Sequence, residues 1–352
     1  MSRVDFIVPA GIDDLTRPSG GNAYDRRIAR DLFSAGWAVS LHEVPGPWPE
    51  ADAQSLDALA TVVGGIPDGS RVLLDGLVAS AAPEVLTAEA GRLRLVVLVH
   101  MPLGHGTTDA VTRERERAVL SAASFVVTTS AWARRSLLEL YPLPGDRVRV
   151  ATPGVDRAEL APGTATAGAL LSVAAVIPGK GHDVLLDALA PLAGLRWECS
   201  CVGSLERDPA FVERLQRRVL DGGMRGRVRF TGPQAEADLV QSYAAADVLV
   251  LPSRGETYGM VVSEALARGL PVVAAEVGGV PEALGRCADG TRPGLLVPPD
   301  DPTALRDALR SWLEDASLRR RLRTAARERR ASLADWTATT SAVGEVLQEA
   351  AR

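Results

Sequence analysis

One stretch, from Asp247 to Leu284, limits what this chain can fold into more than any other part of the sequence. It holds two short apolar runs rich in valine, VLVLP and PVVAA, with the helix-favouring segment SEALA between them. Gly269 and Pro271 stand where such a helix would end and the next strand would begin. The stretch therefore predicts a strand, a glycine-containing loop, a helix and a second strand.

The same alternation of apolar runs and helical patterns extends over the whole chain. The strand-like runs are VDFIVPAG, AVSLHEV, SRVLLDGL, RLVVLVH, SFVVTTS and RVRV in the first half, and ALLSVAAV, WECSCVG, VRFTG, DVLVLP, PVVAAE and GLLVP in the second. Strands separated by helices favour a parallel sheet that is covered on both faces. We predict an α/β protein with two doubly wound, Rossmann-like halves that face a cleft, and ligands at the carboxyl ends of the strands.

A segment of small residues divides the two halves. Glu159–Gly168, ELAPGTATAG, combines Pro, Gly and Thr in a way that is typical of a linker. The length of 352 residues also favours about two domains. We predict a first domain over residues 1–160, a second over residues 161–334, and a last helix over residues 335–352.

Composition excludes several classes of function. With 39 basic and 44 acidic residues the net charge is −5, which gives no general attraction for nucleic acid. No apolar run reaches about 18 residues and no signal-peptide core is visible, so we expect neither a transmembrane segment nor secretion by that route. The cysteines Cys199, Cys201 and Cys287 suit buried positions in a reducing cytoplasm. The basic segment Leu318–Ser332 is expected to be a solvated helix face, with a lipid- or nucleic-acid-binding role as the alternative and peripheral membrane contact left open.

Two carboxylates in the opening stretch point to a ligand. Glu256 lies on the loop before the predicted helix and Glu264 lies within it, and eight helical residues would span roughly 12 Å. The start of a helix favours a bound anion. A carboxylate for sugar hydroxyls, a helix start for a diphosphate and a second carboxylate for a ribose would together hold a nucleotide sugar. The candidate residues here are Glu256, Thr257, Tyr258, Gly259, Met260, Val261 and Glu264.

Three further positions are candidates at strand ends. Gly20 and Gly21 open the first helix and could approach a phosphate, although a turn explains the pair equally well. Lys180, the chain's single lysine, lies in a glycine-rich loop where a compact point charge would suit a phosphate. His100 ends a strand and could contact a reacting sugar, and a purely structural histidine is the alternative.

Weaker expectations concern the neighbours of these candidates. Asn22 is predicted to cap the first helix, whose apolar stripe would be formed by Ala23, Ile28, Leu32 and Phe33. His182 could cap the helix after Lys180, and His42 is expected to be structural. His105 is expected on a loop, where it could contact the acceptor. Pro233 and Gln234 follow a strand and could contact a nucleotide base through their backbone groups.

The longest motif resembles that of a known family. LPSRGETYGMVVSEALARGLPVVAAEVGGVPE is similar, nearly position by position, to the E-x7-E motif of retaining glycosyltransferases of family 4. The resemblance implies a GT-B architecture in which the second half binds a nucleotide-diphosphate sugar and the first half binds the acceptor. It also implies retention at the anomeric carbon, no metal and no cofactor beyond the donor itself, which is a co-substrate. Residues 335–352 would then cross back to the first domain.

The resemblance assigns roles to the candidate residues. Glu256 would grip sugar hydroxyls, Glu264 would fix the ribose, and Lys180 with the helix start at Gly259 would stabilise the leaving diphosphate. The glycine pair would touch the distal phosphate, and His100 would contact the reacting sugar. The family's arginine five residues before the lysine is Ala175 here, so either the diphosphate is bound more weakly or Arg254 or Arg17 supplies a second cation.

Several alternatives follow from the same residues. The donor could be a UDP- or a GDP-sugar, and the acceptor a small molecule, a glycan or a lipid-linked sugar. Loops 45–50 and 101–109 are expected to contact that acceptor. A nucleotide-sugar epimerase of GT-B architecture, or a nucleotide-sugar-binding protein without transferase activity, are the two alternatives to a transferase. The loss of the arginine at Ala175 motivates the second of them.

Overall fold

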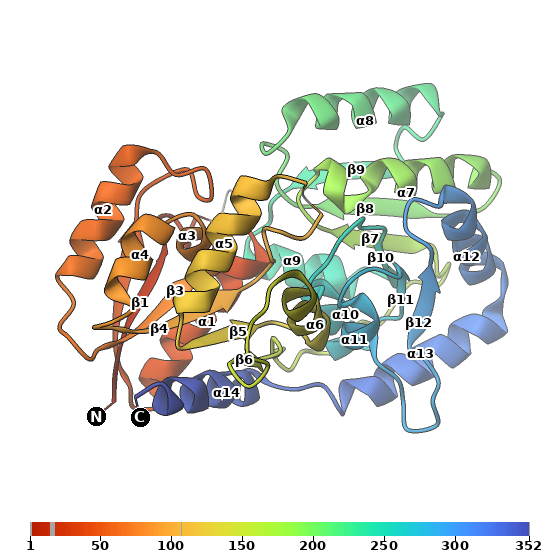
Figure 1. Cartoon of the computed structure of the whole chain (residues 1–352). Coiled ribbons are helices and arrows are strands. Elements are labelled where there is room, and N and C mark those ends of the chain that lie inside the picture. The colour runs from red at the N-terminus through yellow and green to blue at the C-terminus, as the bar shows by residue number, and fades with distance from the viewer. Residues whose placement is uncertain (1, 15–17, 107, 352) are drawn as a thin grey trace. The chain divides into compact units, whose positions relative to one another are not determined.

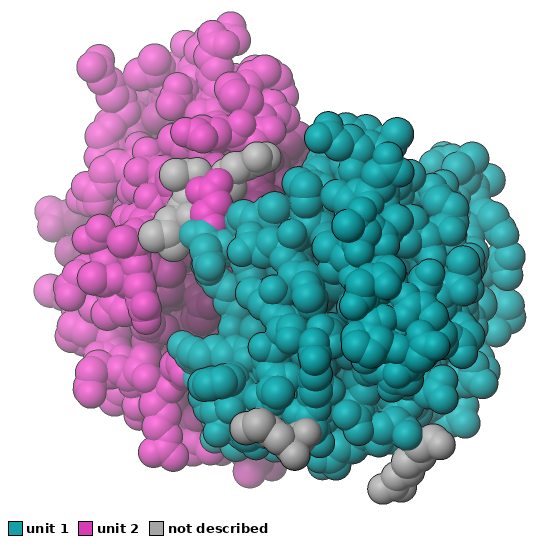
Figure 2. Space-filling model, turned by 90° about the vertical axis from the view of Figure 1, so that its left-hand side faces the viewer, with its two compact units in different colours: residues 1–13, 20–154, 335–352 teal, residues 14–19, 155–334 magenta. Residues whose placement is uncertain are grey.

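The computed structural model describes residues 2–14, 18–106 and 108–351 (Figure 1). The chain forms two compact units, which Figure 2 distinguishes by colour. Unit 1 comprises residues 1–13, 20–154 and 335–352, and unit 2 comprises residues 14–19 and 155–334. Each unit contains one parallel six-stranded sheet, and each is described below by itself.

Unit 1 is built on a sheet with strand order β2-β1-β3-β4-β5-β6, in which every neighbouring pair is parallel. Its strands are β1 (Arg3–Pro9), β2 (Ala38–Val44), β3 (Arg71–Asp75), β4 (Arg94–Val99), β5 (Phe125–Thr128) and β6 (Val148–Val150). The run Leu95–Val99 of β4 is buried throughout, as expected for a central strand with helices on both faces.

The helices of unit 1 connect these strands and cover the sheet (Figure 1). They are α1 (Gly20–Ser34), α2 (Ala53–Gly64), α3 (Gly76–Ser80), α4 (Pro83–Glu89), α5 (Ala110–Ala122), α6 (Ala131–Leu140) and α14 (Trp336–Glu349). Although α14 is last in the chain, it packs against α1, and the Trp336 ring meets the Tyr24 ring edge-to-face at 5.5 Å. Residues 335–352 therefore belong to the same unit as the first strands.

The buried face of α1 differs from the predicted one. Phe33 is 68% exposed, whereas Tyr24, Asp25, Ile28 and Leu32 are buried, so the predicted place of Phe33 in the apolar stripe is wrong. The prediction overlooked that Asp25 follows the same helical period as Ile28 and Leu32. Asn22 lies inside the helix, which begins at Gly20, and so it is not the predicted cap. A carboxylate thus lies on the core side of α1.

Unit 2 also contains a parallel six-stranded sheet, with the strand order β12-β11-β10-β7-β8-β9. Its strands are β7 (Ala169–Val173), β8 (Glu198–Val202), β9 (Val228–Gly232), β10 (Val248–Leu251), β11 (Val272–Ala275) and β12 (Gly294–Val297). Its helices are η1 (Pro178–Lys180), α7 (His182–Leu189), η2 (Ala190–Leu192), α8 (Pro209–Asp221), α9 (Glu236–Ala244), α10 (Met260–Ala267), α11 (Val280–Leu284), α12 (Pro302–Glu314) and α13 (Ala316–Arg330).

The predicted run of strands is therefore confirmed in both halves. Each of the strand-like runs named from the sequence contains one strand, and the stretch from Asp247 to Leu284 forms β10, α10, β11 and α11. Because all strands of a sheet run the same way, their carboxyl ends meet at one edge of each unit. Both edges carry candidate residues.

The basic helix α13 uses several arginines within its own unit. Arg323 pairs with the fully buried Asp247, with 2.7 Å between nitrogen and oxygen. Arg319 donates to the Trp312 carbonyl oxygen at 2.7 Å, and Arg330 donates to the Ala267 carbonyl oxygen at 2.8 Å. These contacts attach α13 to its neighbours. The prediction of a solvated helix face did not include this structural role of the arginines. No helix in the described part of the chain combines the length and the apolar character needed to cross a membrane.

Candidate active site

Lys180 and Glu256 form an ion pair at the carboxyl edge of the sheet in unit 2. Lys180 ends η1, which follows β7, and Glu256 lies on the loop after β10. Because β7 and β10 are parallel neighbours, the two loops leave the sheet side by side. The Lys180 Nζ lies 2.6 Å from Glu256 Oε1, and the side chains are only 28% and 13% exposed. The structure thus joins two predicted site residues that are 76 positions apart.

Two neighbours fix the position of Glu256. The Ser253 hydroxyl donates to Glu256 Oε1 at 2.8 Å, and the Gly279 backbone N–H donates to the Glu256 carbonyl oxygen at 2.9 Å. A charged acceptor makes the first of these bonds stronger than one between neutral groups. Glu256 is therefore held from both its side chain and its backbone before any ligand binds.

Gly181 allows the lysine loop to approach β10. Its φ of +68° is in the left-handed region, and a Cβ there would lie 2.0 Å from the Pro252 carbonyl oxygen. A side chain at this position would push the two loops apart. The Lys180–Glu256 contact thus depends on a glycine at position 181.

The start of α10 follows directly after the Glu256 loop. Gly259 is the N-cap residue and provides no side-chain hydrogen bond, and the Val262 N–H bonds to the Gly259 carbonyl. Tyr258 is 7% exposed and packs in the core, while Thr257, Met260 and Val261 are half-buried. A helix start without a side-chain cap leaves backbone donors for an anion. The contact of residues 257–261 with an anion stays a prediction.

Glu264 occupies a different environment in the same helix. It accepts a hydrogen bond from the Tyr243 hydroxyl at 2.7 Å. Burial raises the pKa of Glu264, and the Tyr243 hydrogen bond and the Arg268 charge offset this only in part. Arg268 in turn lies over the Tyr243 ring, 4.5 Å from its centroid. Glu264 is a half-buried acceptor with ordered partners, and its predicted contact with a ribose stays a prediction.

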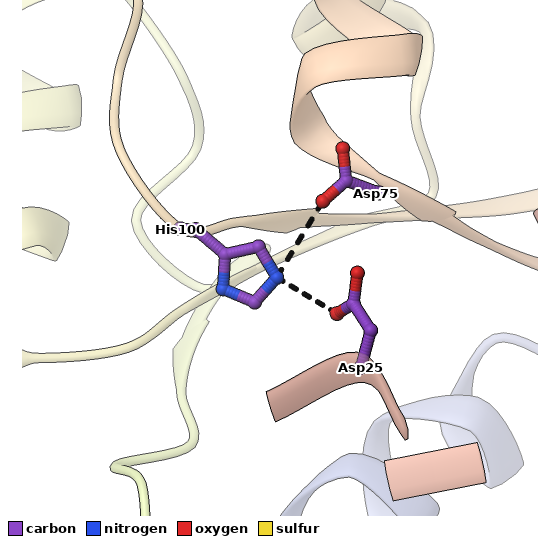
Figure 3. Close-up of side chains that lie close together, drawn as sticks. All are labelled: Asp25, Asp75 and His100. Carbon is purple, nitrogen blue, oxygen red and sulfur yellow. Dashed lines mark hydrogen bonds and ion pairs between the residues drawn. The ribbon is translucent and has the colours of Figure 1, made fainter. Parts of the chain in front are cut away.

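In unit 1, two aspartates lie on the same side of the His100 ring (Figure 3). It follows β4, whereas Asp75 ends the neighbouring strand β3 and Asp25 lies in α1. The His100 Nε2 is 2.7 Å from Asp25 Oδ1 and 3.5 Å from Asp75 Oδ2. The ligand atoms of all three residues lie within 4.8 Å of one another, close enough to surround a single cation. The predicted site residue His100 therefore has two carboxylate partners that the sequence did not reveal.

The glycine pair lies beside this histidine. Gly20 and Gly21 form the first turn of α1, as predicted. A Cβ at Gly21 would lie 3.2 Å from His100 Cδ2, which is tighter than an ordinary contact. Packing against His100 thus explains a glycine at position 21 without any contact to a phosphate. Its predicted phosphate contact stays a prediction.

Pro233 and Gln234 follow β9, at the same edge of the sheet as Lys180. Pro233 is exposed, and the Gln234 side-chain oxygen accepts a hydrogen bond from the Ser242 hydroxyl at 2.8 Å. Both residues line a hollow of about 1220 Å³ beside α9, whose lining does not include Lys180, Glu256 or Glu264. Their predicted contact with a nucleotide base remains a prediction.

Comparison with known proteins identifies the family. Residues 165–329 match the family described as Glycosyl transferases group 1, and residues 72–159 match Glycosyltransferase Family 4. The chain belongs to glycosyltransferase family 4. It is 36% identical over 265 residues to D-inositol 3-phosphate glycosyltransferase of Saccharomonospora viridis, covering 67% of this chain and 57% of that protein. It is 30% identical over 299 residues to the protein of that name from Corynebacterium diphtheriae, covering 76% and 65%.

Solved structures share the fold of this family 4 member. Sucrose-phosphate synthase from Thermosynechococcus elongatus superposes with a TM-score of 0.80 at 23% identity, covering 99% of both chains. Anabaena Alr3699/HepE in complex with UDP and glucose superposes with a TM-score of 0.79 at 19% identity, covering 99% of this chain and 100% of that one. The chain thus has the predicted GT-B fold of two Rossmann-like α/β domains. It spans little more than half the length of the first curated relative.

This family member lacks the arginine that the family has five residues before the lysine, as a second cation for the diphosphate. Ala175 is half-buried and offers no charge. Arg254 lies close to the lysine loop, because its backbone N–H donates to the Gly179 carbonyl at 2.9 Å. However, its guanidinium pairs with Asp183 at 2.9 Å and with Asp300 at 2.6 Å. Arg254 therefore serves the structure of the loop, and Arg17 lies outside the described residues.

Four partners of the site were missed from the sequence. Asp25 and Asp75 hold His100, Ser253 holds Glu256, and Tyr243 holds Glu264. Signals existed for two of them. Asp25 is a carboxylate on the apolar period of a helix, and Asp75 ends the buried strand VLLD. Tyr243 gave no such signal, since a buried tyrosine is usual in a core.

The other histidines have separate surroundings. His182 is buried, and neither of its ring nitrogens has a partner among the described residues, so the predicted helix cap is wrong. His42 pairs with the buried Asp5, with 2.9 Å between Nε2 and Oδ1, as expected for a structural histidine. His105 is exposed on its predicted loop, where it bonds to the Ser136 hydroxyl at 3.1 Å.

Proposed function

We propose that this family 4 member transfers a sugar from a nucleotide-diphosphate sugar, UDP- or GDP-linked, to an acceptor hydroxyl with retention of configuration. The observation that carries the proposal is the Lys180–Glu256 pair beside the uncapped start of α10. It combines a cation, a carboxylate and backbone donors at the edge where sheets of this class bind ligands. A diphosphate and a sugar with free hydroxyls are the groups that match these donors and acceptors.

In this proposal the donor lies on unit 2. Its diphosphate contacts Lys180 and the backbone N–H groups at the start of α10, and its sugar hydroxyls donate to Glu256. Glu264 accepts from the ribose hydroxyls, since its half-buried carboxylate already accepts from the hydroxyl of Tyr243. Pro233 and Gln234 contact the base. Binding would replace the ion pair between Lys180 and Glu256 by contacts of each residue with the donor.

The chemistry follows from where charge develops. As the bond between the sugar and the diphosphate breaks, negative charge grows on the leaving oxygens, and Lys180 with the helix start stabilises it. Glu256 is held by Ser253 and faces sugar hydroxyls, so it orients the sugar rather than attacking it. The leaving phosphate takes the acceptor proton on the same face. The reaction needs no cofactor or metal in this scheme.

Unit 1 contributes the acceptor side. His100 and the loop that follows it would contact the acceptor hydroxyl or the transferred sugar. Glu116 fixes this loop, because its buried carboxylate accepts from the Leu103 and Gly104 N–H groups, both at 2.8 Å. Cyclitol phosphates belong in the acceptor panel because the curated relatives are named for an inositol phosphate. A cytoplasmic location and contact with a membrane surface stay part of the proposal.

The test has two stages. A thermal-shift panel of UDP-, GDP- and ADP-sugars should identify a donor, which is then incubated with an acceptor panel while nucleoside diphosphate release is followed. Proton NMR of the product should show the anomer of the donor. Tight donor binding with neither turnover nor slow hydrolysis of the donor would favour a binding protein. Formation of an isomeric nucleotide sugar would favour an epimerase. A product with inverted configuration would overturn the mechanism.

A further inference from the structure

We propose that Asp25 and Asp75 are positioning residues that hold His100 as an imidazolium, so that its outward Nδ1–H donates to an oxygen of the bound substrate. The substrate in this statement rests on the proposed function, whereas the protonation of His100 can be tested without it. A cation fixed on the unit 1 side would complement a hydroxyl oxygen of the acceptor or of the transferred sugar.

The geometry of the cluster determines which ring nitrogen faces inward. Both carboxylates converge on Nε2, at 2.7 Å from Asp25 and 3.5 Å from Asp75. The other ring nitrogen lies on the side away from both aspartates (Figure 3). The exposed fraction is 17% for the His100 side chain, against 1% and 4% for the side chains of Asp25 and Asp75. Nε2 therefore carries the internal bond, and Nδ1 is the nitrogen left for a ligand.

Charge balance supports the imidazolium. Burial by itself would lower the pKa of His100, but the charge and hydrogen bond of Asp25, together with the charge of Asp75, raise it above its ordinary value. Burial, added to repulsion by Asp25, raises the pKa of Asp75 to about 7. One carboxylate, one imidazolium and one largely neutral acid then sum to no net charge below that pH. A buried cluster is least costly in this state.

A buried oxygen of Asp25 fits the same assignment. Asp25 Oδ2 has no hydrogen-bond partner among the described residues. The charge of Asp25 is close enough to Asp75 to raise the pKa of Asp75, and Asp75 Oδ1 accepts from the Leu77 N–H at 2.7 Å. A proton on Asp75 would give Asp25 a second donor beside His100. Asp25 would then accept from both of its neighbours.

Other titratable groups around His100 do not disturb this balance. In the described part of the chain, the groups that face it are Asp25 and Tyr24 from α1 and Asp75 from the end of β3. The Tyr24 ring meets the imidazole edge-to-face at 5.2 Å, and its hydroxyl donates to the Ala151 carbonyl at 2.8 Å. Burial and the Asp25 charge raise the pKa of Tyr24 well above its usual value, so it stays neutral.

A metal ion is the competing occupant of the cluster. Two ligands of one tetrahedral zinc ion lie roughly 3.4 Å apart, given metal–ligand bonds of about 2.1 Å. The 2.7 Å between His100 Nε2 and Asp25 Oδ1 is shorter and has the length of a charge-assisted hydrogen bond. The distance therefore favours a proton, and a metal is an outcome that the experiment must detect.

The experiment follows the histidines by NMR in the full chain. Selective ¹³C and ¹⁵N labelling reports the protonation of the four imidazoles. Variants that each replace one histidine assign the NMR signals. We expect His100 to titrate above its ordinary value. Asp25→Asn should lower the His100 midpoint by about two pH units, because the hydrogen-bonded carboxylate then no longer offsets the effect of burial. Asp75→Asn should lower it less, because Asp75 contributes charge only once it ionises.

Asp5→Asn is the matched control. It removes the carboxylate from the second aspartate–histidine pair of the same unit, at His42, and should leave the His100 midpoint unchanged. A His100 that titrates at or below its ordinary value, or that does not respond to Asp25→Asn in a folded variant, overturns the proposal. Stoichiometric binding of Zn²⁺ or Mn²⁺ that Asp25→Asn and Asp75→Asn both abolish overturns it in favour of a metal site. Thermal unfolding reports whether Asp25→Asn folds, and Asp75→Asn provides a second test.

A kinetic measurement connects the imidazolium to catalysis. Activity should fall as pH rises above the His100 midpoint, and this alkaline fall should begin at lower pH in Asp75→Asn. His100→Gln, which keeps a neutral N–H donor, should retain reduced activity without that fall. If no substrate pair is turned over, the proposed function fails while the NMR result still decides the charge of His100. If the protein is active but His100→Gln keeps the pH dependence of the wild type, the role of His100 as a hydrogen-bond donor is wrong, while the proposed function stands.

Discussion

The two units are each built on a parallel six-stranded sheet, but they treat charge differently at the carboxyl edges of those sheets. In unit 1 the side chains of Asp25 and Asp75 are 1% and 4% exposed and their charges are balanced within the cluster around His100. In unit 2 Lys180 and Glu256 are 28% and 13% exposed and pair across two loops. The first arrangement holds a side chain in one protonation state. The second can exchange its internal partner for a ligand.

Two histidines express the same contrast. Carboxylates beside His100 raise its pKa. Burial lowers the pKa of His182 to about 4; the charge of Asp183 acts in the opposite direction, and the charge of Lys180 lowers this pKa further. His182 has no hydrogen-bond partner among the described residues and remains neutral. Topology thus places a histidine near a strand end in each unit, and the neighbouring side chains decide its charge.

The strongest test of the contrast is to break the unit 2 pair. Glu256→Gln should reduce kcat about 100- to 1000-fold, because the residue orients the reacting sugar, and Lys180→Ala should weaken nucleoside diphosphate binding about 10- to 100-fold. Calorimetry and steady-state kinetics measure the two effects. Each single change also leaves a half-buried charge unpaired, so the double variant should lose less stability than the sum of the singles.

Arg229→Ala is the control for that experiment. It removes an exposed ion pair with Glu198, in which the side chains are 62% and 63% exposed, and should change neither binding nor kcat. Unchanged diphosphate affinity in Lys180→Ala would remove Lys180 from the site. Additive losses of stability would show that the ion pair is not coupled.

A smaller effect is expected at Glu264. Its pKa is raised by burial, so its charge is held at a cost that Glu264→Gln removes. The variant should unfold at a slightly higher temperature while the donor KM rises about tenfold and kcat stays the same, because a hydrogen bond to a charged group is lost on donor binding. Tyr243→Phe, which removes only the partner hydroxyl, should raise KM less. An unaltered donor KM in Glu264→Gln would contradict the ribose role.

The smallest effect concerns stability against pH. The folded pKa of Asp75, about 7, lies above its ordinary 3.8, so the folded state keeps a proton that the unfolded state has lost, and stability should fall as pH rises from 4 to 7. The folded pKa of His182, about 4, lies below its ordinary 6.5, so stability should rise over nearly the same range. The two slopes oppose each other, and His100, whose pKa is raised above its ordinary 6.5, lowers stability further as pH rises above that value.

Calorimetric scans between pH 4.5 and about 7.5 separate these opposing slopes. Asp75→Asn should make Tm rise more steeply with pH than in the wild type, and His182→Asn should make it fall, each by a few degrees at the ends of the range. Parallel curves for the three proteins would contradict the protonation states assigned to both units.

The sequence by itself determined the strands, the helices and the local part of the candidate site. Apolar period, glycine and proline positions placed the elements, because these signals act between residues a few positions apart. The Glu256–Glu264 spacing and the start of α10 are likewise contained in one stretch, and so they could be predicted. The same signals misplaced Phe33, which lies beside the buried face of α1 but outside it.

Tertiary structure alone decided the partners. Lys180 meets Glu256 because β7 and β10 are neighbours in a sheet whose order does not follow the chain. His100 meets Asp75 and Asp25 because the ends of β3 and β4 converge and α1 begins beside them, with a glycine at the contact. A side chain's charge depends on burial and on carboxylates brought from elsewhere in the chain, and no local pattern contains that information. The sequence therefore located the two edges, and the packing of each unit set the charge at each.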